Sequence, residues 1–99
     1  MIVYEVTVIV ADELVERYEK YMVEQHIPDV LATGYFVSSE MSRSGDKYRI
    51  SYYAESQEKL DAYLASDTER LRADFAAHFP TGVEVTRDVW TVIADIKAL

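Results

Sequence analysis

The chain has 99 residues, 49% of them hydrophobic and 28% charged, which is enough for one hydrophobic core but not for two, so a single domain over residues 1–99 is expected. Eighteen acidic residues against ten Lys and Arg give a formal charge of −8, which disfavours nucleic acid and anionic membrane surfaces as partners. Because there is no cysteine and no apolar run long enough for a signal sequence or a membrane span, disulfides and thiolate chemistry are excluded and a cytoplasmic location is expected.

The N-terminal segment alternates in polarity, which predicts a β-strand from Met1 to Ala11, followed by a helix for which Asp12 can serve as N-cap. One face of the strand is entirely apolar, and the other is a mixture that includes Glu5. The apolar face consists of Ile2, Tyr4, Val6, Val8 and Val10. We expect helices to cover that face and to leave the mixed face free.

The predicted helix carries a histidine toward the core. At 100° per residue, Tyr18, Met22 and His26 fall within a narrow arc, so the imidazole continues an apolar stripe. Pro28 has no amide hydrogen to donate and restricts the residue before it, so the helix is expected to end there, with a short extra turn before Gly34. His26 is therefore predicted to lie at a junction between elements, which is a suitable place for a site.

A β-hairpin is predicted next. The runs from Tyr35 to Ser42 and from Lys47 to Ala54 alternate, and the Ser44-Gly45-Asp46 turn signal separates them. The second run has an apolar face and a polar-aromatic face that carries Arg49 and Tyr53. Its apolar positions are Tyr48, Ile50, Tyr52 and Ala54.

The C-terminal part of the chain predicts an interrupted helix and a last strand. Ser56 can cap the helix, and the capping-box pattern over residues 66–69 indicates a restart or kink. Pro80-Thr81-Gly82 ends the helical region, and alternation from Val83 to Val92 predicts the final strand. Residues 93–99 form a short tail that is either docked on a neighbour or frayed.

The order β-α-β-β-α-β predicts an α+β fold of the ferredoxin-like type, with a four-stranded antiparallel sheet and its helices on one face. The helix-free face would combine apolar, aromatic and charged side chains, namely Val3, Glu5, Ile9, Arg49 and Tyr53. A second sheet laid across this mixture would enclose a lined cavity. We therefore expect a homodimer that forms through the helix-free sheet face.

Three short stretches and one longer block resemble a family of short bacterial proteins of unknown function: Met1-Ile2-Val3-Tyr4-Glu5-Val6-Thr7-Val8, Tyr53-Ala54-Glu55-Ser56, Tyr63-Leu64 and the most specific part, His26-Ile27-Pro28-Asp29-Val30-Leu31-Ala32-Thr33-Gly34. That family is similar in turn to the dimeric α/β-barrel superfamily. The resemblance implies a homodimer whose two sheets face each other, with a pocket between sheet and helices in each subunit. Relatives of this architecture include cofactor-free monooxygenases, muconolactone isomerase-like enzymes, haem enzymes and ligand-sensing modules, and the fold does not choose among them.

His26 is the candidate catalytic residue, as a general base or acid, because its unperturbed pKa lies near neutrality. The alternative is a core histidine that is hydrogen-bonded to a carbonyl at the helix end. A metal site is not expected, since His78 is the only other histidine and no Asp or Glu spacing completes a ligand set. The late-helix residues Arg70, Arg72 and Asp74 are expected to form a solvated face.

Glu5, Arg49, Tyr53 and Tyr35 are the candidate ligand-binding residues. Glu5 and Arg49 share a face of the central strands, where they could form an ion pair or, through Arg49, hold a ligand carboxylate. Tyr53 and Tyr35 are candidate pocket walls or phenol donors, with plain packing as the alternative.

The sequence thus supports two functional hypotheses. The first is a small dimeric α/β-barrel protein that binds a small, partly apolar organic molecule, as a cofactor-free isomerase, lyase or monooxygenase that uses His26. The second is a non-catalytic ligand-sensing or protein-interaction module. No cofactor is expected, and haem binding, a third alternative, would require an axial ligand that faces an apolar cavity.

Overall fold

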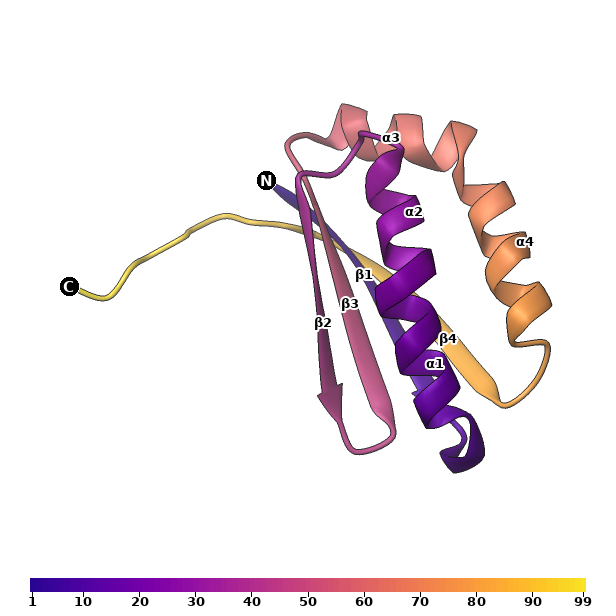
Figure 1. Cartoon of the computed structure of the whole chain (residues 1–99). Coiled ribbons are helices and arrows are strands. Elements are labelled where there is room, and N and C mark those ends of the chain that lie inside the picture. Colours follow the sequence, from indigo (N-terminus) through magenta and orange to yellow (C-terminus); the bar gives the residue numbers. More distant parts are fainter.

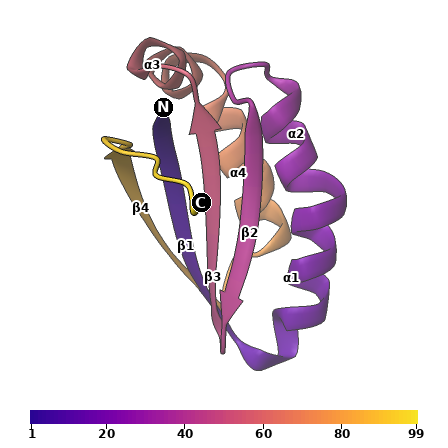
Figure 2. The ribbon, with the colours of Figure 1, turned by 90° about the vertical axis from the view of Figure 1, so that its left-hand side faces the viewer.

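The computed structural model describes residues 1–99 as a four-stranded sheet with helices on one of its faces (Figures 1 and 2). The strands are β1 (Ile2–Val10), β2 (Ser38–Ser44), β3 (Lys47–Ala54) and β4 (Val83–Thr91). The helical segments are η1 (Asp12–Leu14), α1 (Val15–Tyr21), η2 (Met22–His26), α2 (Ile27–Ala32), α3 (Gln57–Ser66) and α4 (Thr68–His78). The sheet is antiparallel in the order β2-β3-β1-β4, so the predicted ferredoxin-like α+β fold is confirmed.

The two predicted faces of the central strands are also confirmed. In the β1–β3 ladder, Val8 lies opposite Tyr48 and Tyr4 opposite Tyr52, and all four are buried under the helices. The core is rich in aromatic contacts: the ring of Tyr18 lies 4.9 Å from that of Tyr48. Because side chains alternate along a strand, the residues between these positions lie on the helix-free face.

Pro28 does not end the first helix, and that prediction was wrong. The segments α1, η2 and α2 form one continuous helical column (Figure 1). In the π-helical segment η2, the amide of Ile27 donates to the carbonyl of Met22, five residues earlier. Pro28 then lies in the first turn of α2, directly after this π-helical turn, in which the hydrogen-bond spacing has widened from four residues to five. The column ends at Gly34 instead, whose φ of +85° suits only a residue without a side chain.

The hairpin and the interrupted helix follow the predictions. Gly45, with φ of +63°, lies in the turn between β2 and β3. The Oγ of Ser56 accepts a hydrogen bond from the Lys59 amide at 3.3 Å and caps α3. The helical region breaks at Asp67, between α3 and α4.

Strand β2 begins at Ser38 and not at Tyr35 as predicted. The side chain of Phe36 turns into the core, where its ring lies 4.9 Å from that of Tyr63 and 5.3 Å from that of Tyr52. The chain therefore joins the ladder only at Val37, whose amide donates to the carbonyl of Tyr53 at 2.8 Å. Core packing of one aromatic ring overrides weak strand alternation here.

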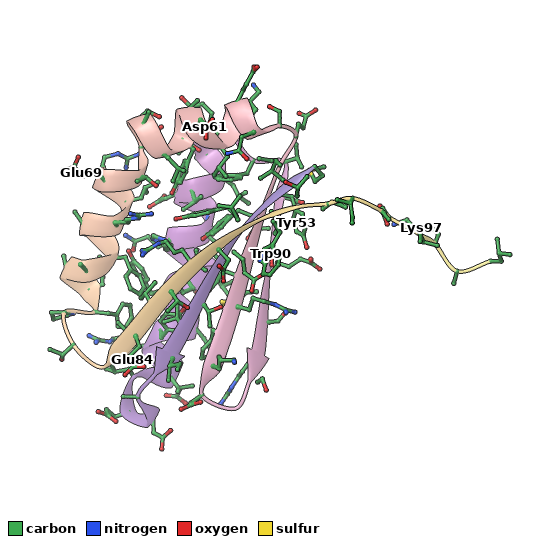
Figure 3. All side chains as sticks on the ribbon, turned by 180° about the vertical axis from the view of Figure 1, so that it is seen from behind. Tyr53, Asp61, Glu69, Glu84, Trp90 and Lys97 are labelled. Carbon is green, nitrogen blue, oxygen red and sulfur yellow. The ribbon has the colours of Figure 1, made fainter.

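The helix-free face is exposed in the single chain. Figure 3, which views the molecule from the side opposite to Figure 1, shows Tyr53 and Trp90 over the strands. Trp90 is 54% exposed. After a hydrogen bond from the Val92 amide to the Met1 carbonyl at 3.0 Å, the tail leaves the sheet and extends away from the body (Figure 1), with Ile93 94% exposed. No helix combines the length and the apolar character that a membrane crossing requires.

Candidate functional site

A cavity of about 50 Å³ lies between the helix-covered face of the sheet and the helices. Thirteen residues line it, and they come from β1, β3, β4, η2, α2, α3 and α4. Ten of them are hydrophobic or tyrosine side chains, and the other three are His26, Arg72 and Arg87. A mainly apolar wall with a few polar groups is the usual composition of a small-molecule site.

His26 is the last residue of the π-helical segment η2 and lines this cavity. Met22, at the other end of η2, also lines the cavity. π-Helical turns are rare and occur frequently at functional sites. The imidazole lies 5.8 Å from the ring of Tyr21 and 5.5 Å from that of Phe75, between centroids. Its Nδ1 is buried and has no hydrogen-bond partner, so Nδ1 does not make the carbonyl bond that the structural alternative required.

The surroundings of His26 favour the neutral imidazole. Burial lowers its pKa from the ordinary value of 6.5, and the nearby charges of Arg87 and His78 lower it further. The carboxylates of Asp74 and Asp29 act in the opposite direction but are outweighed. At neutral pH the ring therefore has one nitrogen with a lone pair that can accept a proton or a hydrogen bond.

Two arginines join His26 at the cavity, and sequence reasoning missed both. Arg72 is exposed, as predicted for a solvated face, but its Nη2 also donates to the hydroxyl of Tyr4 at 3.0 Å and the residue lines the cavity, which was not predicted. Asp74 is half-buried, and its Oδ2 accepts a hydrogen bond from Tyr21 at 2.9 Å. Arg70 is exposed, as predicted, and pairs with Asp67, the residue before α4, at 3.2 Å.

A signal for Arg87 was present in the sequence. On β4 the alternate residues Val83, Val85, Arg87 and Val89 form the series that faces the helices, and the register places Arg87 opposite Val6 of the apolar face. A single arginine inside an apolar series marks a position where a charge is retained among hydrophobic neighbours. Arg72 carried a weaker signal, because it follows Leu71 directly and therefore borders the apolar stripe of α4.

The sheet separates Glu5 and Arg49 from His26. Both lie on the helix-free face, where they line a shallow hollow of about 280 Å³ with residues of β2 and β3. The expected ion pair between them does not form in the single chain, because neither residue takes part in a salt bridge within 4.0 Å. In the register Arg49 lies opposite Thr7 and Glu5 opposite Ser51, so the two are diagonal and not direct neighbours.

The two candidate tyrosines also lie apart. Tyr53 is on the helix-free face and donates a hydrogen bond to Oε1 of Glu40 at 2.5 Å. Tyr35 lies near α3, where its hydroxyl is 3.4 Å from Oγ of Ser66 and its ring meets that of Tyr63 edge-on at 6.4 Å. No cluster of three or more His, Cys, Asp or Glu side chains is arranged to hold a metal ion.

The sequence matches a protein-family model over residues 1–93, and the description of that family is Domain of unknown function (DUF4286). The chain belongs to this family. The resemblance inferred from the His26 block is thereby confirmed, and DUF4286 membership fixes no reaction. No curated protein matches the chain.

Solved structures share the fold of this DUF4286 protein. A putative antibiotic biosynthesis monooxygenase from Deinococcus radiodurans is 13% identical, with a TM-score of 0.67, over 100% of this chain and 99% of that one. The haem degrader MhuD of Mycobacterium tuberculosis, with two haems bound in its active site, is 16% identical, with a TM-score of 0.67, over 98% and 100%. A de novo designed protein with a ferredoxin fold is 22% identical, with a TM-score of 0.57, over 99% and 91%. At these identities the likeness shows the fold and not the chemistry.

Proposed function

We propose that this protein binds a small, partly apolar organic molecule in the cavity between sheet and helices, and that His26 contacts the ligand. The observation that carries the proposal is the buried Nδ1 of His26, which has no partner although the ring lines the cavity. Leaving a buried polar atom unpaired costs about 1–3 kcal/mol, a cost that a bound ligand would remove. Monooxygenases and a haem degrader of the same fold support a ligand site in this architecture.

Within this proposal, the chemistry is proton transfer without a cofactor. A neutral imidazole in an apolar pocket can take a proton from an acidic C–H or O–H group of the ligand. That step is common to the cofactor-free isomerase, lyase and monooxygenase reactions expected from the sequence. The lowered pKa of His26 keeps the ring ready to accept the proton at neutral pH.

The second candidate is a non-catalytic ligand-sensing or interaction module. The absence of a carboxylate among the cavity-lining residues favours it, because His26 then has no acidic partner to orient it or to relay the proton. In this case the same cavity binds a ligand that is released unchanged.

Haem does not fit the cavity as it stands. A cavity of about 150 Å³ is needed to hold benzene, whereas this one offers about 50 Å³, so a porphyrin would require the helices to move away from the sheet. The unpartnered imidazole is a possible axial ligand in chemical type, but the space around it is too small. We therefore assign no haem-dependent step to this chain.

We also propose a homodimer in which two helix-free faces pack together as a dimeric α/β barrel, in the cytoplasm. Trp90 and Ile9, 54% and 38% exposed, provide apolar area on that face. The tail supplies further apolar area, because Ile93 and Ile96 are about nine-tenths exposed and extend beyond the sheet. In such a dimer Glu5, Arg49 and Tyr53 would line the space between the two sheets, and they stay proposed ligand contacts there, on the other side of the sheet from the His26 cavity. Tyr35 lies outside that space, near α3, and stays a proposed contact on its own.

Histidine NMR and hydrogen exchange test the proposal. The chain has two histidines, so the ring signals of His26 and His78 can be assigned by substitution. Small branched acids, amides and ketones should shift the His26 signals and leave those of exposed His78 in place. An enzyme should also exchange an acidic C–H of the bound compound for deuterium in D₂O, and His26→Gln should abolish that exchange. Binding without exchange supports the sensing module, and unchanged His26 signals with every compound contradict both.

A further inference from the structure

The charges that line the His26 cavity are all of one sign. The chain carries eighteen acidic residues and ten Lys and Arg, yet no carboxylate lines this cavity and two arginines do. Arg72 comes from α4 and Arg87 from β4, so two separate elements each contribute an arginine to the lining of one cavity. A random sample of this chain's charges would contain mainly acids. The local excess of positive charge therefore requires an explanation of its own.

Neither arginine has an acidic partner. The ion pairs of the chain join Arg43 to Glu19, Arg70 to Asp67, His78 to Asp74 and Lys97 to Asp95. Arg70 and Arg72 stand two residues apart on the same helix, but Arg70 is paired with a carboxylate and Arg72 is not. A guanidinium carries five donors, and Arg72 uses one of them on the hydroxyl of Tyr4. The remaining donors of Arg72 and all those of Arg87 are free to bind an anion.

The two arginines are held at the mouth of the cavity and not in its floor. Both residues are exposed, whereas Tyr4, to which Arg72 donates, is only 5% exposed. The floor is apolar, with Val30 and Leu71 each 1% exposed. The cavity thus has a charged, solvent-facing end and an apolar, buried end.

We infer that the ligand of this cavity is a small amphipathic monocarboxylate, whose apolar group enters the floor and whose carboxylate is held at the mouth by Arg72 and Arg87. This inference rests on the proposed function of ligand binding at His26 and names the class of ligand. Guanidinium groups match a carboxylate geometrically, with two parallel N–H donors for two oxygens. His26, deeper than the mouth, then faces the carbon atoms next to the carboxylate.

Size and charge narrow the class. About 50 Å³ is roughly a third of the volume that holds benzene, so a short branched chain fits the closed cavity better than an aromatic ring does. A net charge of −8 repels a doubly charged anion more strongly than a singly charged one. A branched monocarboxylate of roughly four to six carbon atoms satisfies both the limit on size and the preference for a single negative charge.

Calorimetric titration of acid and amide pairs tests the inference. The probes are 3-methylbutanoate and 4-methylpentanoate, each beside its uncharged amide of nearly the same shape, and inorganic phosphate. We expect the unaltered protein to bind an acid at least about tenfold more tightly than the matching amide, the scale of a charge-assisted bidentate contact. Phosphate should bind more weakly than either acid, because it brings no apolar group.

Arginine variants test whether Arg72 and Arg87 cause the preference for acid over amide. Arg72→Gln with Arg87→Gln should remove the preference for acid over amide and leave binding of the amide in place. Arg70→Gln is the matched control, since it removes an arginine from the same helix that does not line the cavity, and it should keep the preference. If the double variant unfolds, the acid and amide comparison in the unaltered protein still decides the question of charge.

The outcomes separate this inference from the proposed function. Equal binding of acid and amide, a preference that survives the double substitution, or phosphate that binds as tightly as the acids would overturn the carboxylate assignment while ligand binding at His26 stands. Failure of both acids and both amides to bind, with unchanged His26 signals for every small compound tried, would overturn both.

Discussion

The two faces of the sheet are built from alternate residues of the same strands, and they differ in how far their side chains are buried. On the covered face, Ile50 is fully buried and Val8 is 2% exposed, and a small cavity lies at His26. On the helix-free face, Ile9 is 38% and Trp90 is 54% exposed, beside charges that have no ion-pair partner. One face therefore contributes to stability within the single chain. The other can contribute only when something covers it.

The largest expected effect on stability comes from replacing isoleucine by alanine, and it should differ between the two faces of the sheet. Ile50→Ala should lower the free energy of unfolding by about 2–5 kcal/mol, because it leaves a cavity in a packed core. Ile9→Ala, on the neighbouring strand and the opposite face, should cost less than about 1 kcal/mol in a single chain. Urea unfolding at two protein concentrations measures both. A large, concentration-dependent loss for Ile9→Ala would show that the helix-free face is covered in solution.

Dimerisation gives the next largest effect. Reversing the charge at Arg49 would place a second carboxylate beside Glu5 on a face that is enclosed in the proposed dimer, at a cost of about 3 kcal/mol or roughly a hundredfold in the dissociation constant. Sedimentation equilibrium of Arg49→Glu measures this. Lys59→Glu on α3, exposed and away from that face, is the matched control and should leave the dimer unchanged. A protein that sediments as a monomer at micromolar concentration contradicts the proposed dimer itself.

The elements that sequence reasoning placed well are those where pattern and burial agree. Strand β3 has the predicted bounds, Lys47 to Ala54, because its alternation matches one covered and one free face. The helix column was misjudged at Pro28, since the backbone rule for proline assumes an unbroken α-helical ladder and η2 changes that ladder one turn earlier. No local sequence pattern predicts a π-helical turn, because such a turn depends on how the helical column packs on the sheet.

The site was predictable only in part, for a similar reason. His26 was found because it continues a helical stripe, which is a local pattern. Arg72 and Arg87 line the same cavity only through the packing of α4 and β4, which lie far from η2 in the sequence. Glu5 and Arg49 share the helix-free face, as predicted, and the sheet therefore lies between them and His26.

On the covered face, a substitution of His26 should separate an effect on stability from an effect on ligand binding. Since Nδ1 of His26 has no partner to lose, His26→Gln should change the free energy of unfolding by less than about 1 kcal/mol while it weakens binding of a carboxylate probe about tenfold. Thermal melting beside calorimetry measures the two quantities. His78→Gln, a substitution of the exposed histidine outside the cavity, serves as control. A loss of 1–3 kcal/mol in stability for His26→Gln would instead support the structural histidine.

The smallest effect is the dependence of stability on pH that His26 produces. Its pKa is lowered in the folded chain, chiefly by burial and further by Arg87 and His78, against the opposing carboxylates of Asp74 and Asp29. The unfolded chain, with a histidine pKa of about 6.5, therefore binds this proton at a higher pH than the folded chain does. The contribution of neutral His26 to the free energy of unfolding is fully present above the histidine pKa of the unfolded chain. It falls as the pH is lowered from there to the folded pKa, by at most about 1.4 kcal/mol per pH unit for one proton, and the contribution of His26 is constant below it.

Urea unfolding of the unaltered protein and of His26→Gln between pH 7.5 and 5.5 isolates this contribution, because the other titrating groups are common to both. The difference in free energy between the two proteins should shift in favour of the variant as the pH falls, since glutamine does not take up a proton. A carboxylate bound at Arg72 and Arg87 would reduce the shift, because a nearby negative charge favours the protonated ring. A difference that moves in the opposite direction would mean that the protonated imidazole is the form stabilised by the fold, and Asp74 and Asp29, not burial, would then dominate the environment of the cavity.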